Sequence, residues 1–207
     1  MRFYVYIVAS LMLAGTFIAG GGDMSTFRRK LLQQAQIKPV NYLQSSGAAL
    51  LHTDYIPKAA SRYYIDFQLM SARSARVELM NGGHNYYSQA RLATAGGSFS
   101  FTKNYKRKLA GWNNDNVRHV LSMSDPTTIC LDDGDTQTLI NPTNETTSPV
   151  YFFSSGSWRL YRWKVIENDE IIADLRPAID ASNVPCFYDV VSNKCFYANN
   201  QDLLIYG

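Results

Sequence analysis

Acidic residues gather in one short stretch toward the C-terminal end of the sequence: Glu167, Asp169, Glu170 and Asp174. Two carboxyl groups on opposite sides of a glycosidic bond can act as general acid and as nucleophile or base in its hydrolysis. The residues around this cluster predict a hairpin turn, however, and not a concave sheet face. The sequence therefore favours a non-enzymatic protein, with a glycoside hydrolase as the alternative.

A second group of carboxylates, Asp132, Asp133 and Asp135, surrounds Gly134. An oxygen-rich loop of this kind could bind calcium. The same residues are also typical of a tight turn, because aspartate and glycine tolerate turn conformations. No cofactor is predicted, and calcium at these three aspartates is the one metal that the sequence leaves open.

Histidines and cysteines give little evidence of a catalytic or metal site. His52, His84 and His119 have neither metal-ligand nor triad spacing, and no Gly-x-Ser-x-Gly motif occurs. Cys186 and Cys195 flank a predicted hairpin and could form a cross-strand disulfide if their side chains face each other. Their spacing matches no zinc template. The alternative is that they are free, buried thiols.

Aromatic and amide side chains gather in two predicted loops. Sugar binding uses aromatic faces beside planar amides and carboxylates, and aromatic side chains in loops are less easily explained as core. The alternative is that they pack beneath the loops. The candidate ligand-binding residues are Tyr86, Tyr87, Trp112, Asn113, Asn114 and Asp115. Trp158 and Trp163 are instead predicted to belong to the core.

Short segments of alternating hydrophobic and polar residues predict the strands that must position these groups. The clearest segments are Arg62–Met70 and Leu160–Val165. In the second segment the two parities are Leu160, Arg162 and Lys164 on one side and Tyr161, Trp163 and Val165 on the other.

Turn residues separate the predicted strands about every 10 residues, which is typical of a sandwich. Asn81-Gly82-Gly83 predicts one turn, and 132–135 and 167–170 predict two hairpin turns. Pro177 indicates an edge position or the end of a strand, because proline cannot donate a ladder hydrogen bond. The expected fold is all-β, with two antiparallel sheets.

The charge and the N-terminal stretch bear on partners and location. A formal net charge of +3 over 207 residues is too weak and too scattered to favour nucleic acid. Phe3–Ala19 is nearly all apolar, so it could be a signal-peptide core or a membrane-contacting anchor. The basic run Arg28–Lys30 after it weakens the export interpretation. If Met24 is the natural start, the apolar stretch is a docking helix or Met1–Asp23 is an upstream extension.

The predicted organisation has two parts. Residues 1–39 form a hydrophobic segment and a basic helix or linker, with the helix over Arg28–Gln36 and a break at Pro39. Residues 40–207 form the β domain.

Two distant stretches carry a family resemblance. YLQSSGAALLHTDYIP…SRYYIDFQL and WRLYRWKVIENDEIIADLRPAID…VPCFYDVVSNKCFYAN resemble the concanavalin A-like (LamG-like) jelly-roll domains of bacterial surface and bacteriophage structural proteins. The matching positions are Tyr42, Ser46, Gly47, Thr53, Arg176, Pro177, Tyr188 and Asp189. Leu50 and Asp54 stand where the family has an aromatic residue and a glycine.

The resemblance implies a two-sheet antiparallel jelly-roll sandwich over residues 40–207, in which Tyr42–Thr53 contacts the Arg176–Tyr206 region. It also implies a rim loop that can bind calcium. The expected function is a non-catalytic surface or virion-associated module that binds glycan or surface polysaccharide, or mediates adhesion or particle decoration. Its expected place is extracellular, on a cell surface or in a virion, with protein partners there and membrane contact through Phe3–Ala19. A purely structural assembly subunit is the alternative.

Overall fold

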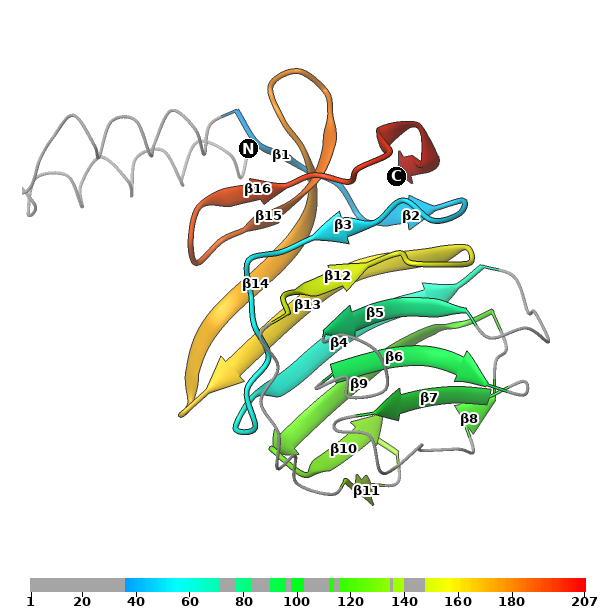
Figure 1. Cartoon of the computed structure of the whole chain (residues 1–207), viewed down its shortest axis with the longest axis vertical. Helices are drawn as coiled ribbons and strands as arrows, with labels where there is room; N and C mark the ends of the chain where they lie inside the picture. Colours follow the sequence, from blue (N-terminus) through cyan, green and yellow to red (C-terminus); the bar gives the residue numbers. More distant parts are fainter. Residues whose placement is uncertain are drawn as a thin grey trace, which may run out of the picture. The chain divides into compact units, whose positions relative to one another are not determined.

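The computed structural model describes residues 36–70, 77–82, 90–95, 98–102, 112–113, 116–134, 136–139 and 148–207. Contacts divide the chain between Ile37 and Lys38, and every strand below belongs to the unit Lys38–Gly207. This unit is all-β, with two antiparallel sheets that form a β-sandwich (Figure 1). The described residues contain no α-helix, and one short 3-10 helix, η3, spans Gln201–Leu203.

The larger sheet has 11 strands. Its main path follows the order β11 (Thr136–Thr138), β10 (Thr128–Leu131), β9 (Arg118–Asp125), β4 (Arg62–Leu69), β13 (Trp158–Glu167), β14 (Glu170–Ile179), β15 (Pro185–Asp189) and β16 (Lys194–Phe196). Three short strands pair beside this path: β1 (Lys38–Pro39), β2 (Leu43–Ser45) and β17 (Leu204–Tyr206). The predicted hairpin turns at 132–135 and 167–170 are confirmed, since β10 pairs with β11 and β13 with β14.

The smaller sheet has 6 strands in the order β3 (Leu51–His52), β12 (Val150–Phe152), β5 (Glu78–Gly82), β6 (Ala90–Ala95), β7 (Ser98–Thr102) and β8 (Trp112–Asn113). The predicted turn at Asn81-Gly82 is wrong, because both residues belong to β5 and pair with β12 and β6. Close packing explains the glycine. A Cβ at Gly82 would lie 2.6 Å from Pro57 and 2.8 Å from Val150, so only glycine fits without a shift.

Aromatic side chains from both sheets fill the space between them. Trp163 of β13 makes edge contacts with Phe152 of β12 and with Tyr55, both with ring centroids 5.4 Å apart. Trp158 and Trp163 are fully buried, which confirms that they belong to the core. Such ring pairs add stability beyond the area that they bury.

The alternation along β13 is interrupted, and this corrects the predicted parity. The pairing of β13 with β4 shifts register between Leu160 and Arg162. A bulge of this kind inserts one extra residue and reverses which parity faces the core. Leu160 therefore points into the sandwich with Trp163, whereas Tyr161 lies on the outer face.

The two ends of the β domain meet, as the sequence predicts. Strand β17 pairs with β2, and Leu51 forms an isolated bridge with Ala198. The backbone N–H of Asn41 donates to the carbonyl of Gly207 at 2.6 Å. Strand β1 pairs with β14 as well, which places Lys38 and Pro39 within the sheet, slightly before the boundary expected from the sequence.

The expectation that Pro177 lies at a sheet edge or at the end of a strand is wrong, because β14 continues through Pro177 and pairs with β15. The proline is tolerated because the pairing of β13 with β14 ends at Leu175. On that side the Pro177 carbonyl accepts a hydrogen bond from the Val40 N–H at 3.1 Å, and no ladder donor is needed from the proline nitrogen.

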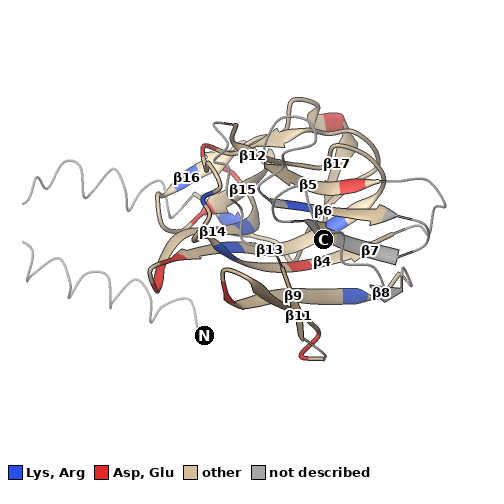
Figure 2. Cartoon of the chain, turned by 60° about the horizontal axis from the view of Figure 1, so that its bottom comes forward, with Lys and Arg blue, Asp and Glu red and all other residues tan. Residues whose placement is uncertain are grey.

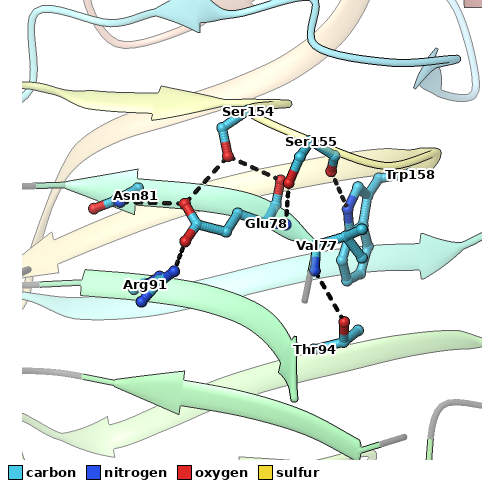
Figure 3. A network of polar contacts seen from close by, with 8 residues as sticks. All are labelled: Val77, Glu78, Asn81, Arg91, Thr94, Ser154, Ser155 and Trp158. Atoms are coloured by element: carbon cyan, nitrogen blue, oxygen red, sulfur yellow. Dashed lines mark hydrogen bonds and ion pairs between the residues drawn. The ribbon is translucent and has the colours of Figure 1, made fainter. Parts of the chain in front are cut away.

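A half-buried polar network fixes the connection between the sheets (Figure 3). The Glu78 carboxylate on β5 pairs with Arg91 on β6 and accepts a hydrogen bond from Ser154 at 3.2 Å. Beside it, the Ser155 hydroxyl accepts from the Glu78 N–H at 3.0 Å, and the Ser155 carbonyl accepts from the Trp158 indole at 3.0 Å. The loop that carries the chain from the smaller to the larger sheet is thus held at both ends.

Candidate functional site

The outer face of the larger sheet carries a continuous array of charged and aromatic side chains. Residues that alternate with the core positions of β4, β9, β13 and β14 point outward here. Figure 2 marks basic residues in blue along β9 and β13. We call the set the arginine–tyrosine face; it consists of Tyr42, Gln44, Tyr64, Asp66, Gln68, Arg118, Arg159, Tyr161, Arg162, Lys164, Asp174 and Arg176.

Asp66 holds Arg118 in one orientation. The Nε and Nη2 groups of Arg118 donate to the two carboxylate oxygens of Asp66 at 2.7 and 2.6 Å. The Asp66 side chain is 8% exposed and the Arg118 side chain 54% exposed, so the carboxylate lies beneath the guanidinium. Arg118 also covers the ring of Tyr161 at 3.9 Å from its centroid. The two contacts together fix the guanidinium plane against the sheet.

Asp174 plays the same part for two arginines. Arg162 donates through Nε and Nη2 to its two oxygens, both at 2.7 Å, and Arg176 donates through Nη2 at 2.8 Å. The Asp174 side chain is 4% exposed. Burial raises the pKa of Asp174, but the hydrogen bonds from Arg162 and Arg176 outweigh it, and the pKa lies below its usual value.

Tyrosines and amides fill the spaces between the arginines. Arg159 lies 4.2 Å above the ring of Tyr42 and donates to Gln44 at 2.7 Å. The Tyr161 hydroxyl donates to Gln68 at 2.8 Å. These contacts restrict the long side chains before any ligand arrives, which lowers the entropic cost of binding.

Donor groups remain directed toward solvent after these contacts are made. The bidentate pairs use Nε and Nη2 of Arg118 and Arg162, which leaves Nη1 of each without a hydrogen bond to the described residues. Lys164 lies 5.2 Å from the ring centre of Tyr64. Within the face, five basic side chains stand against two carboxylates, so it carries a net positive charge. The arrangement can bind anions without a further rearrangement.

The candidate ligand-binding residues from the sequence cannot be placed at this face. Tyr86, Tyr87, Asn114 and Asp115 lie outside the described residues, and so do Phe3–Ala19 and Asp135. Trp112 and Asn113 form strand β8 in the smaller sheet, and their side chains are outside the description. The described residues contain no helix that is long and apolar enough to cross a bilayer.

The calcium candidates lie in the turn between β10 and β11. Asp132 accepts from the backbone N–H of Val120 at 2.7 Å and contacts His119 Nδ1 at 2.5 Å, so both oxygens already have protein partners. Asp132 and Asp133 both have positive φ, as expected for a tight turn. In the part of the chain that the structure describes, no three histidine, cysteine or acidic side chains are grouped to hold a metal.

Three of the four residues of the acidic cluster near the β13–β14 turn, Glu167, Asp169 and Asp174, form ion pairs. Glu167 accepts from Lys58, Tyr55 and Ser61 at 2.8, 2.8 and 2.9 Å. Burial raises the pKa of Glu167, but these hydrogen bonds prevail and the pKa is lowered. Asp169 pairs with Arg62 at 2.7 Å. The proton donor of a glycosidase has a raised pKa, whereas the pKa values of Glu167 and Asp174 are lowered.

A cavity of about 250 Å³ opens beside the β15–β16 hairpin, near the inner side of the sheet. Its floor is apolar, with Trp163, Leu175 and Phe196. Lys194 and Asp54 form an ion pair at its lining. The hydrogen-bonding groups of Thr53, Tyr55 and Asp189 in the lining are used within the protein.

The sequence matches no protein-family model, and no curated protein is significantly similar to it. The β-sandwich is the fold class that a resemblance to concanavalin A-like domains implies. The family itself stays a prediction, because no family model matches.

The sequence did not predict the arginine–tyrosine face, and the reason is physical. The interruption at Leu160–Arg162 mixes inward and outward residues on each predicted parity, so no arginine stripe stands out in β13. The partners come from strands far apart in the sequence, such as Asp66 and Arg118. The detectable pattern was the density of arginine and tyrosine in RLYRWK, which exceeds what a core strand needs.

Proposed function

We propose that this sandwich is a concanavalin A-like jelly roll that acts as a non-catalytic binding module for acidic glycans at a cell surface or in a virion. The arginine–tyrosine face is the binding surface. The observation that carries the proposal is the pair of buried carboxylates, Asp66 and Asp174, that hold exposed arginines with unused donors. The jelly-roll assignment is supported by the pairing of β17 with β2.

Carboxylates suit this face because each can accept hydrogen bonds from fixed guanidinium groups, which are stronger than hydrogen bonds between neutral groups. An acidic polysaccharide repeats its carboxylates along a chain, and the face offers several basic groups across adjacent strands. Gln44 and Gln68 add planar amides that can contact sugar hydroxyls.

Nucleic acid fits the face less well. Sequence-independent binding of single strands uses open aromatic surfaces on which bases stack. Here a guanidinium lies over the rings of Tyr161 and Tyr42, supplied by Arg118 and Arg159. With two of its three tyrosine rings occupied in this way, the face favours an anionic sugar chain.

Calorimetric titration of the full-length chain tests the proposal. The probes are polygalacturonate, hyaluronate and polysialic acid, with methyl-esterified polygalacturonate as the neutral match for the first. Binding is expected for at least one acidic polymer, with an affinity that falls as salt is raised. Neutralising Arg118 or Arg162 as Arg118→Gln or Arg162→Gln should weaken binding about tenfold each, because each removes a charge-assisted hydrogen bond.

The matched control is Lys194→Gln, which removes one exposed positive charge at the cavity, outside the face. It should leave the affinity nearly unchanged. Equal binding of polygalacturonate and its methyl ester would contradict the proposal, and so would tighter binding of single-stranded DNA than of every acidic polymer.

A structural assembly role is the second candidate, and a separate observation favours it. Four aliphatic side chains are exposed at one end of the larger sheet: Ile171, Ile172, Val190 and Val191. They come from the start of β14 and the turn after β15, which lie side by side, and Ile172 also lines the apolar cavity. A second copy of the chain could cover them. Light scattering of the wild type and of Ile171→Lys tests this, since a dimer that the variant abolishes would support it.

A further inference from the structure

The β15–β16 hairpin carries two cysteines on the same outer side of the sheet. Tyr188 pairs with Cys195 in the ladder, which places Cys186, two residues before Tyr188, diagonally across from Cys195. Phe187 and Phe196 alternate with them and point into the core. Both thiols are free, and the two side chains are near enough that each perturbs the ionisation of the other.

The two sulfurs differ in exposure and in surroundings. Cys186 is fully buried, whereas Cys195 is partly exposed. The Tyr197 hydroxyl lies beside Cys195 and donates to Asp180 at 2.9 Å. The Cys195 thiol can therefore meet a dissolved reagent, whereas the Cys186 thiol is closed to solvent.

We propose that Cys186 and Cys195 form a reversible dithiol site, in which Cys195 is the nucleophile toward small disulfides and Cys186 is the resolving thiol. The position of the two cysteines on one side of adjacent strands and the burial of only one of them carry the assignment. The neighbouring Cys186 thiol lowers the pKa of Cys195 to about 7. The proximity of Cys195 and burial raise the pKa of Cys186. The charged group facing the pair is Asp180, which opposes thiolate formation at both sulfurs.

The reaction with glutathione disulfide proceeds in two exchanges. The Cys195 thiolate attacks one sulfur of glutathione disulfide, forms a mixed disulfide and releases one glutathione thiolate. Cys186 then attacks the Cys195 sulfur, and its proton passes to the second glutathione thiolate as that thiolate leaves. Two cysteine thiols are oxidised by two electrons, and one glutathione disulfide is reduced to two glutathione molecules. The product links β15 covalently to β16.

Mass spectrometry of the full-length chain after treatment with glutathione disulfide tests the site. The wild type should lose two hydrogen atoms and give a cross-linked peptide containing Cys186 and Cys195, and dithiothreitol should reverse this. Cys186→Ser should retain one glutathione on Cys195, because the resolving thiol is gone. Cys195→Ser should leave Cys186 unmodified under the same conditions. Cys130, which is partly exposed and lies on β10, is the internal control and should react more slowly than Cys195.

A measurement on the unaltered chain keeps the test independent of the variants' folding. A brief pulse of iodoacetamide followed by peptide mapping should label Cys195 first, with a rate that rises steeply through about pH 7. Preferential labelling of Cys130, a stable glutathione adduct on wild-type Cys195, or the absence of a Cys186–Cys195 cross-link would each overturn the proposal.

Discussion

The two faces of the larger sheet are built from the same strands but have opposite characters. On the inner face, Trp158 and Trp163 of β13 are fully buried among apolar side chains. On the outer face, Arg159 and Arg162 of the same strand are fixed by hydrogen bonds and remain partly exposed. Residues one position apart therefore have different roles. The inner side chains stabilise the fold, and the outer side chains form the charged surface. The comparison predicts that substitutions on the two faces separate folding from binding.

Truncation of an inner residue should have the largest effect. Trp163→Ala removes ring contacts with Phe152 and Tyr55. It should lower the free energy of unfolding by about 3–5 kcal/mol, as large-to-small changes of buried aromatic residues do. Urea unfolding followed by circular dichroism measures this. Tyr161→Ala, on the outer face, is the matched control. A loss as large for Tyr161→Ala would contradict the division between the faces.

Removal of a carboxylate beneath the outer face should have an intermediate effect on stability and a clear effect on binding. Asp174→Asn leaves Arg162 and Arg176 with a neutral partner for their charged donors. The expected loss is about 1–3 kcal/mol of unfolding free energy, as for other hydrogen bonds to charged groups. Binding of acidic glycan should weaken although the net charge becomes more positive, because the arginines lose their fixed geometry. Tighter binding would show that charge alone matters.

Acid should destabilise the protein partly through Glu167. Its pKa is lowered in the folded protein, so its contribution to stability is fully present above the unfolded pKa of about 4 and is lost as pH falls through the folded pKa. The wild type should therefore lose stability on acidification below about pH 4 more steeply than Glu167→Gln. Thermal melts across this pH range measure the difference. Parallel curves for the two proteins would mean that Glu167 does not contribute.

Removal of the ion pair at the end of the outer face should have the smallest effect. Asp169 is 93% exposed and pairs with Arg62. Asp169→Asn should change the unfolding free energy by about 0.5 kcal/mol or less, since solvent screens exposed pairs. Urea unfolding in low and high salt is the measurement. A larger change would indicate that the β13–β14 turn depends on this contact.

The fold was more predictable from sequence than the candidate site. Alternation and turn residues identified most strands, because burial of one face is a local property of each strand. The contacts between Asp66 and Arg118 and between Asp174 and Arg162 depend on strand order and register, which no local pattern contains. Errors arose where packing overruled local preference. Gly82 lies within a strand, where Pro57 and Val150 leave no room for a side chain, and the bulge at Leu160–Arg162 reverses the parity of β13.

The position of β2 has a consequence for how the chain reaches its fold during synthesis. This strand leaves the ribosome early, yet its two neighbours in the sheet, β13 and β17, are translated much later. The backbone hydrogen-bonding groups of β2 have no strand partner until the intervening segments have emerged. Contacts between such distant segments form slowly. Ordering of the sheet around β2 is therefore expected only after residues 204–206 have left the exit tunnel.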